Sequence, residues 1–188
     1  MNLQADLGAY VKIYKDAIPT EICDRTIALL QNANWKREQF YSGRTKTKRD
    51  TDVPLDVSFD LLPNNQEIIG CVWDALKEYV FQEINVPWLP GWDGFSAPKY
   101  NRYSQGHGME MHCDHIRSLF DGERKGIPVL TALMLLNDEF EGGEFILCDE
   151  VMPLNKGEII VFPSNFLYPH KVAEIKSGTR YSSVCWVW

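Results

Sequence analysis

The chain has 188 residues, 45% of them hydrophobic and 12% aromatic, which is enough for one sizeable core and short for two. Its formal charge of -7 and pI near 5.1 argue against a nucleic-acid-binding surface that covers the whole molecule, although a local basic patch is still allowed. Five cysteines without a CxxC pair argue against a disulfide scaffold and a zinc knuckle, and favour a reducing, intracellular setting.

Export and membrane signals are absent from the sequence. The N-terminus lacks the positive and apolar regions of a signal peptide, and no apolar run approaches the roughly 20 residues of a membrane span. We therefore expect a cytoplasmic protein without a membrane partner, as a monomer or homodimer, and its size suggests a bacterial or viral origin.

Two helices are predicted in the first half of the chain. Apolar residues at roughly helical spacing predict a helix over about 20–33, with Thr20 as its N-cap. A longer apolar stripe at three- and four-residue intervals predicts a second helix over 64–84, capped by Asn64 or Asn65.

The stretch between these helices, 35–58, is charged and contains interleaved Ser and Thr, which indicates strands joined by a flexible loop. Three segments are candidates for substrate contact: a basic lid within 36–56, centred on 44–52, a second lid at 120–125, and the aromatic segment 88–95. The alternative for the basic stretch is a solvated loop, which we slightly favour over a specific binding role.

From Pro98 onward the pattern changes to short runs bounded by Gly, Pro and Asn. Many short strands with turn signals predict a β-sandwich or barrel, here with the two helices packed outside it. The expected strands are 99–103, 109–112, 129–136, 143–147, 158–162, 171–175 and 181–188.

Three of the four histidines crowd into residues 107–115. In a strand, side chains two apart share a face, so His112 and Asp114 can enter one cavity while Cys113 points away. With the distant His170 they would form a two-His, one-carboxylate set that leaves one side of an octahedral metal open. Fe(II) suits this mixed set, whereas a structural zinc site would have four ligands and more Cys.

The two remaining histidines, His107 and His115, are not expected to bind the metal. A His-X-Asp triplet alone is weak evidence, because it occurs by chance in many surface loops. Its weight comes from the ordered motifs that surround it.

Residues from about Lys99 to Trp188 resemble the catalytic domain of the prolyl 4-hydroxylase-like branch of the 2-oxoglutarate/Fe(II) oxygenases. The resemblance is dense and follows the family's order. It rests on Tyr103-Ser-Gln-Gly106 leading into His112-Cys-Asp114, Thr131 to Asn137, Glu141-Gly-Gly-Glu-Phe145, Pro153 to Phe162, His170-Lys-Val172 and Gly178-Thr-Arg180-Tyr-Ser-Ser-Val-Cys-Trp186.

The resemblance implies roles for three residues besides the metal ligands. Arg180 would hold the distal carboxylate of 2-oxoglutarate through a planar guanidinium, Tyr103 would reach the same carboxylate, and Trp186 would lie near the iron. Core packing explains Tyr103 and Trp186 as well. The chain departs from the family pattern at Pro128 and Leu135, where relatives often have Arg and Tyr, and Leu135 removes one hydroxyl donor.

The implied fold is α+β and mainly β: a double-stranded β-helix, or cupin-like jelly roll, with two N-terminal helices packed outside the sheet. We expect one catalytic domain over 1–188, with support and lid segments in 1–97 and the jelly-roll core in 98–188. The implied cofactors are Fe(II), 2-oxoglutarate as co-substrate and dioxygen, with ascorbate as a candidate reductant. The carboxylate of Asp114 fills the site that halogenating relatives leave for chloride, so hydroxylation is expected.

The substrate stays open at this level. The first hypothesis is a prolyl residue of a peptide or protein, by analogy with the branch. The alternatives are a free amino acid or other small molecule, a nucleic acid demethylated with help from Arg44, Lys46, Lys48 and Arg49, which the acidic composition disfavours, and a non-catalytic ligand-binding jelly roll.

Overall fold

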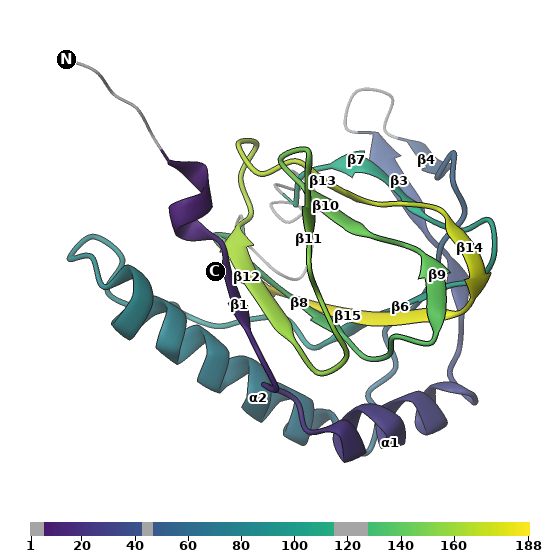
Figure 1. Cartoon of the computed structure of the whole chain (residues 1–188), viewed down its shortest axis with the longest axis horizontal. Coiled ribbons are helices and arrows are strands. Elements are labelled where there is room, and N and C mark those ends of the chain that lie inside the picture. The colour runs from purple at the N-terminus through teal and green to yellow at the C-terminus, as the bar shows by residue number, and fades with distance from the viewer. Residues whose placement is uncertain (1–5, 43–46, 115–127) are drawn as a thin grey trace.

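A computed structural model describes residues 6–42, 47–114 and 128–188 of the chain, with side chains described outside 40–49. Two antiparallel sheets face each other, and two helices run along the outer face of the larger one (Figure 1). This is the predicted jelly roll with two helices outside the sheet.

The larger sheet has the order β1-β12-β8-β15-β6-β5-β2. Strands from both halves of the chain build it, so the N-terminal segments are part of the barrel wall. Its members are Lys12–Tyr14 (β1), Ile159–Pro163 (β12), Leu130–Leu135 (β8), Arg180–Val187 (β15), Lys99–Tyr103 (β6), Asp56–Ser58 (β5) and Lys36–Arg37 (β2).

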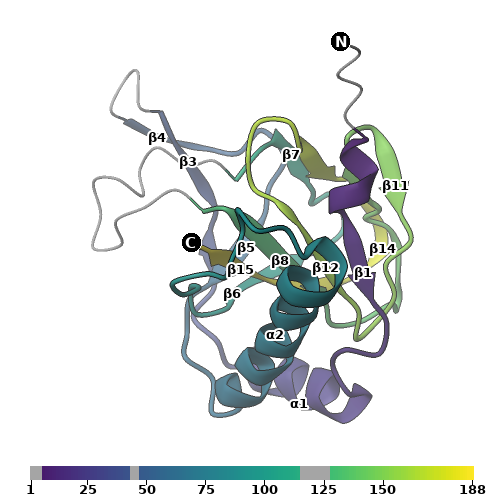
Figure 2. The same cartoon turned by 90° about the vertical axis from the view of Figure 1, so that its left-hand side faces the viewer.

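The opposite sheet has the order β11-β10-β13-β7, and two small ribbons, β14-β9 and β3-β4, complete the β structure. The β3-β4 ribbon projects from the barrel next to β7 (Figure 2). The strands are Glu150–Met152 (β11), Phe145–Leu147 (β10), His170–Val172 (β13), Met109–His112 (β7), Ile175–Gly178 (β14), Phe140–Gly142 (β9), Gln39–Ser42 (β3) and Thr47–Asp50 (β4).

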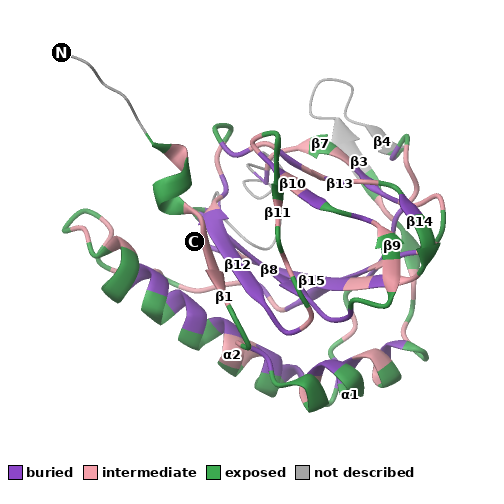
Figure 3. Cartoon of the chain, in the orientation of Figure 1, coloured by how far each residue is buried: buried purple, intermediate pink, exposed green. Residues whose placement is uncertain are grey.

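Alternation along the central strands divides the apolar side chains between two cores. In β12, Ile159 and Val161 pack in the cluster under the helices, while Ile160 and Phe162 pack in the cluster between the sheets. Because both faces of the larger sheet are covered at its centre, β8 and β12 are nearly continuous apolar runs. Figure 3 shows buried residues along the sheet-facing sides of the helices and exposed residues on their outer sides.

The helices are α1, Thr20–Leu30, and α2, Asn65–Glu78, which continues as a π-helix over Tyr79–Ile84. Their existence was predicted, but α1 ends earlier than expected, and the predicted cap Thr20 is wrong because Pro19 is the N-cap. Asn64 is the N-cap of α2, as predicted, although its side chain makes no capping hydrogen bond. Thr20 is the first helical residue, after Pro19. The Asn64 amide instead donates to Thr26 Oγ1 at 2.7 Å, which joins the two helices.

Two strand predictions are wrong in their bounds. The run 171–175 is two strands, because the chain leaves the smaller sheet after Val172 and pairs with β9 from Ile175. The run 143–147 begins only at Phe145, since Gly142 and Gly143 have positive φ values of 74° and 67°. Strands β1, β9 and β11 were not predicted, because three residues each are too short for a recognisable alternation.

None of the helices in the described part of the chain has the length and apolar character needed to cross a lipid bilayer.

Candidate active site

The three predicted metal ligands meet inside the barrel. His112 ends β7 and pairs directly with His170 at the start of β13, and Asp114 follows two residues after the strand. His112 Nε2 lies 3.6 Å from Asp114 Oδ1, and His170 Nε2 lies 3.7 Å from Asp114 Oδ2. One ligand atom from each residue falls within 4.8 Å of the others, and this is the metal-binding group found in the described residues.

Backbone carbonyls set the orientation of both imidazoles. His112 Nδ1 lies 2.8 Å from the carbonyl oxygen of Glu110, and His170 Nδ1 lies 3.1 Å from that of Tyr168. A carbonyl only accepts, so each Nδ1 carries the proton and each Nε2 directs a lone pair toward Asp114. Burial also lowers the pKa of His170, which favours the neutral ligand form.

Asp114 is a buried carboxylate with a hydroxyl donor. Thr131 Oγ1 donates to Asp114 Oδ2 at 2.8 Å, and Ser164 Oγ lies 2.8 Å from the same hydroxyl. Burial acts to raise the pKa of Asp114, but the hydrogen bonds and charges of His112, His170 and Thr131 outweigh it and hold the pKa well below the usual range. Asp114 is therefore an ionised oxygen ligand beside the two imidazole nitrogens.

Arg180, which begins β15, is a buried cation, only 1% exposed. Its Nη1 donates to Ser182 Oγ at 2.9 Å, its Nε has no partner, and its guanidinium lies 5.2 Å from the Tyr103 ring centroid. In the described part of the chain, no carboxylate forms an ion pair with it. A buried guanidinium with an unpartnered donor fits an anionic ligand.

Tyr103 is the cross-strand partner of Arg180 and is buried. Burial raises the pKa of Tyr103 to about 12, although Arg180 and a hydrogen bond with Ser182 act to lower it. Its hydroxyl is therefore a proton donor at neutral pH, as a partner for a carboxylate requires.

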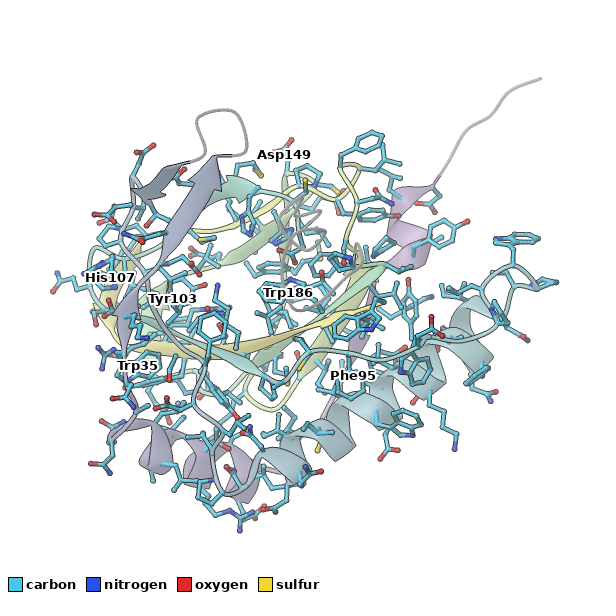
Figure 4. The ribbon with its side chains drawn as sticks, turned by 180° about the vertical axis from the view of Figure 1, so that it is seen from behind. Trp35, Phe95, Tyr103, His107, Asp149 and Trp186 are labelled. Atoms are coloured by element: carbon cyan, nitrogen blue, oxygen red, sulfur yellow. The ribbon has the colours of Figure 1, made fainter. Side chains whose placement is uncertain are left out.

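Trp186 lies in the space between the sheets, whereas Phe95 lies toward α2 (Figure 4). By register Trp186 faces Thr131, the residue that donates to Asp114. The predicted aromatic segment 88–95 does not reach this space, because Trp92 and Phe95 pack in the cluster on the helix side of the sheet.

The other predictions divide between the described and undescribed parts of the chain. His107 is outside the metal group, as predicted, and its buried Nδ1 has no partner. His115 and the lid 120–125 lie outside the described residues, as does part of the basic stretch, 43–46. Of the departures from the family pattern, Leu135 is buried and faces Ser182.

Three polar residues of the site were not assigned a role from sequence: Thr131, Ser164 and Ser182. Each is a hydroxyl residue within or beside an apolar strand, and all three are at most 1% exposed. That isolated polar character was the available signal, but it does not reveal which side chain each hydroxyl binds.

Comparison with known proteins gives the same assignment. Residues 98–188 match the 2OG-Fe(II) oxygenase superfamily. A PKHD-type hydroxylase of Delftia acidovorans is 34% identical over 171 residues, which cover 84% of this chain and 69% of that protein. The chain belongs to the 2OG-Fe(II) oxygenase superfamily.

This oxygenase has further relatives of the same description. A PKHD-type hydroxylase of Stenotrophomonas maltophilia is 36% identical over 99 residues, which cover 50% of this chain but only 43% of that protein. One from Xylella fastidiosa strain M12 is 29% identical over 198 residues, which cover 90% of this chain and 76% of that protein.

Solved structures show that the oxygenase has the predicted jelly-roll fold. A Trichoplax adhaerens prolyl hydroxylase in complex with a hypoxia inducible factor peptide has a TM-score of 0.71 at 16% identity, covering 96% of this chain and 84% of that one. A Pseudomonas putida prolyl-4-hydroxylase has a TM-score of 0.65 at 17% identity, covering 95% and 91%. With the hydroxylase relatives, these confirm the prolyl 4-hydroxylase-like branch.

Fe(II) and 2-oxoglutarate are the cofactors of this oxygenase. The residues present fit both. The His-Asp-His donor set matches a non-haem Fe(II) centre, and the buried guanidinium of Arg180, whose Nε has no partner, matches a dicarboxylate.

Proposed function

We propose that this oxygenase hydroxylates a prolyl residue of a peptide or protein. The observation that carries the proposal is its likeness along 96% of its length to a prolyl hydroxylase that was solved with a peptide. The hydroxylase relatives support a C–H hydroxylation, and the proposal for proline rests on the branch.

In the proposed site, His112, Asp114 and His170 hold Fe(II) through Nε2, a carboxylate oxygen and Nε2. Arg180 and Tyr103 hold the distal carboxylate of 2-oxoglutarate. When bound, Fe(II) and 2-oxoglutarate would supply the oxidising chemistry: 2-oxoglutarate and dioxygen give succinate and carbon dioxide, and the second oxygen atom enters a C–H bond of the substrate.

The contribution of the chain itself is positioning and exclusion of water. Ser182 orients the guanidinium of Arg180, and Thr131 fixes the rotation of the Asp114 carboxylate. His170 and Asp114 are each 4% exposed, so water reaches these two ligands poorly, while the His112 side chain is 21% exposed. We propose that substrate approaches from the His112 side.

The proposal is tested by measuring succinate release from 2-oxoglutarate after anaerobic reconstitution with Fe(II) and exposure to air. A proline-rich peptide should stimulate release and gain about 16 mass units per event, as one inserted oxygen atom adds. His112→Ala and Arg180→Ala should each lose turnover. Stimulation by free L-proline and not by peptide would favour the small-molecule alternative, and turnover that no added compound stimulates would refute the prolyl substrate.

A further inference from the structure

Lys99 is a buried lysine inside the catalytic barrel. It is 8% exposed and begins β6, where its neighbour Tyr100 packs under the helices, so that Lys99 faces the space between the sheets. Its ammonium forms an ion pair with Glu38, and the two side chains are 10% and 15% exposed. Burying such a pair contributes little to stability, because the loss of hydration offsets the attraction. Stability therefore does not explain it.

The ammonium lies at the opposite end of the site from the residues that fit 2-oxoglutarate. Along β6, Tyr103 pairs with Arg180, whereas Lys99 pairs with Val184. Four residues of strand separate Tyr103 and Lys99 by about 13 Å. Lys99 is thus too far along the strand to share the carboxylate that fits Arg180.

The same ammonium lies beside Trp186, the cross-strand partner of Thr131. Its Nζ is 5.6 Å from the ring centroid of Trp186, and Trp186 faces Thr131, which donates to Asp114. On its other side, Nζ is 5.9 Å from the ring centroid of Phe59, which is 63% exposed. The ammonium of Lys99 is therefore close both to Trp186, inside the barrel, and to the exposed ring of Phe59.

We propose that Lys99 determines specificity by donating a hydrogen bond to a main-chain carbonyl of the peptide substrate, with Glu38 holding the ammonium in place. This assignment rests on the proposed function. An ammonium has three donors and Glu38 engages one side of it, so donors remain for a second acceptor.

Charge favours a neutral acceptor. Fe(II), 2-oxoglutarate, Asp114 and Arg180 together carry no net charge, and Glu38 already neutralises Lys99. A carboxylate brought next to Lys99 would be an uncompensated buried charge close to that of Glu38. A peptide carbonyl accepts the hydrogen bond without adding charge.

The test compares Lys99→Met, which keeps the length of the side chain but has no donor, with the wild type. A fluorescent proline-rich peptide is titrated against protein loaded with Mn(II) and 2-oxoglutarate, and kinetics are measured with Fe(II). We expect the Kd and KM for the peptide to rise at least tenfold, while the KM for 2-oxoglutarate changes less than twofold. Glu38→Gln should raise the peptide KM by a smaller factor, because the ammonium loses its anchor.

Lys156→Met is the matched control, because Lys156 forms an ion pair with the exposed Asp24 away from the site, and its peptide KM should stay at the wild-type value. If Lys99→Met does not fold by its thermal transition, the double variant Lys99→Met/Glu38→Gln, which also removes the unpaired buried charge, takes its place under the same criteria. An unchanged peptide KM, or an equal rise in both KM values, overturns the assignment. If the wild type turns over 2-oxoglutarate but binds no peptide, the proposed function is refuted and this assignment with it. If Lys99→Met and Glu38→Gln both hydroxylate the peptide as the wild type does, the assignment alone is refuted.

Discussion

The carboxylate of Asp114 has contacts at both oxygens. Oδ2 accepts from Thr131, while Oδ1 and Oδ2 face the Nε2 atoms of His112 and His170. The Thr131 hydroxyl fixes the rotation of this carboxylate. Loss of such a hydrogen-bond partner of a metal ligand commonly weakens metal binding.

Thr131→Val removes the hydroxyl at nearly constant volume. We expect the affinity for Fe(II), or for Co(II) as a spectroscopic substitute, to fall by about 10- to 100-fold, because the Asp114 carboxylate loses its donor. A metal titration measures this. Thr26→Val is the matched control, since Thr26 Oγ1 accepts from Asn64 between the helices, and it should cost about 1–3 kcal/mol of stability without weakening the metal. Equal metal affinity in wild type and Thr131→Val would contradict the prediction.

Two substitutions of Arg180 should weaken the binding of 2-oxoglutarate to different extents. Arg180→Met should raise the KM for 2-oxoglutarate by about 100-fold or more, because an anion in a buried site loses its counter-charge. Arg180→Lys should raise it by about tenfold, since a lysine keeps the charge but not the planar pair of donors. Steady-state kinetics with varied 2-oxoglutarate measures both. Arg102→Lys, in the part-buried pair with Asp56, serves as control, and similar KM values in all three variants would exclude Arg180 from the binding site.

At the scale of elements, the turn between β9 and β10 explains why two glycines occur together. A Cβ on Gly142 would lie 2.3 Å from the carbonyl oxygen of Glu174. A Cβ on Gly143 would lie 2.3 Å from Ile175 Cδ1 and 3.1 Å from Arg180 Cδ. Both have positive φ, so the backbone passes closely under β14 and beside Arg180 only without side chains.

Gly143→Ala should therefore affect both stability and the site. We expect a loss of about 1–3 kcal/mol in the free energy of unfolding and a higher KM for 2-oxoglutarate, because the methyl group displaces Ile175 and Arg180. Urea denaturation and steady-state kinetics measure the two effects. Gly70→Ala in α2, where a Cβ would meet nothing within 4 Å, should instead stabilise the protein by about 0.5–1 kcal/mol. If Gly143→Ala is destabilised but keeps the wild-type KM for 2-oxoglutarate, the turn does not influence the position of Arg180.

The strands that could be predicted are those with apolar runs that are long enough to recognise and that end at clear turn signals. Strands β6 and β7 match their expected ranges, and β8, β12 and β15 were found within about one residue, because their apolar runs are bounded by clear turn signals. The strand over 171–175 was misread, because pairing with two different strands, not local pattern, divides it into β13 and β14. The position of the α2 cap was predicted at Asn64, but not that its amide makes a tertiary contact with Thr26 in place of a capping bond.

At the scale of the whole molecule, buried tyrosines make the fold sensitive to alkaline pH. Burial raises the pKa of Tyr103 and Tyr168 to about 12, from 10.0, and raises that of Tyr79 and Tyr100 as well. Each folded-state pKa lies above the unfolded one, so the folded state binds the proton more tightly. Stability is therefore fully present below pH 10 and is lost as pH rises from 10 toward 12.

We expect the free energy of unfolding to fall above pH 10 by about 1.4 kcal/mol per pH unit for each such tyrosine. Urea denaturation at several pH values, with tyrosinate absorbance as a second signal, measures the slope. Tyr100→Phe, which removes the hydroxyl that donates to Asn65 Oδ1, should have a shallower slope by one group. A slope unchanged by this substitution would show that Tyr100 does not contribute.

The sequence by itself determined the class of this protein. Few other residue types can serve as metal ligands, as the proposed carboxylate-binding arginine or as turn glycines, so these positions are recognisable in the sequence. His112 and Asp114 were paired by their spacing of two, and His170 was the one histidine distant enough to come from another strand. Tertiary structure alone decided that Thr131 supports Asp114, since Thr131 lies on β8 of the larger sheet and Asp114 follows β7 of the opposite sheet. Ser182, by contrast, lies two residues after Arg180 on the same strand, where the two side chains share a face. It also decided that Lys99 and Glu38, 61 residues apart, form a largely buried ion pair. Side-chain periodicity shows which face a residue lies on, but only strand pairing and packing decide which distant side chain it meets.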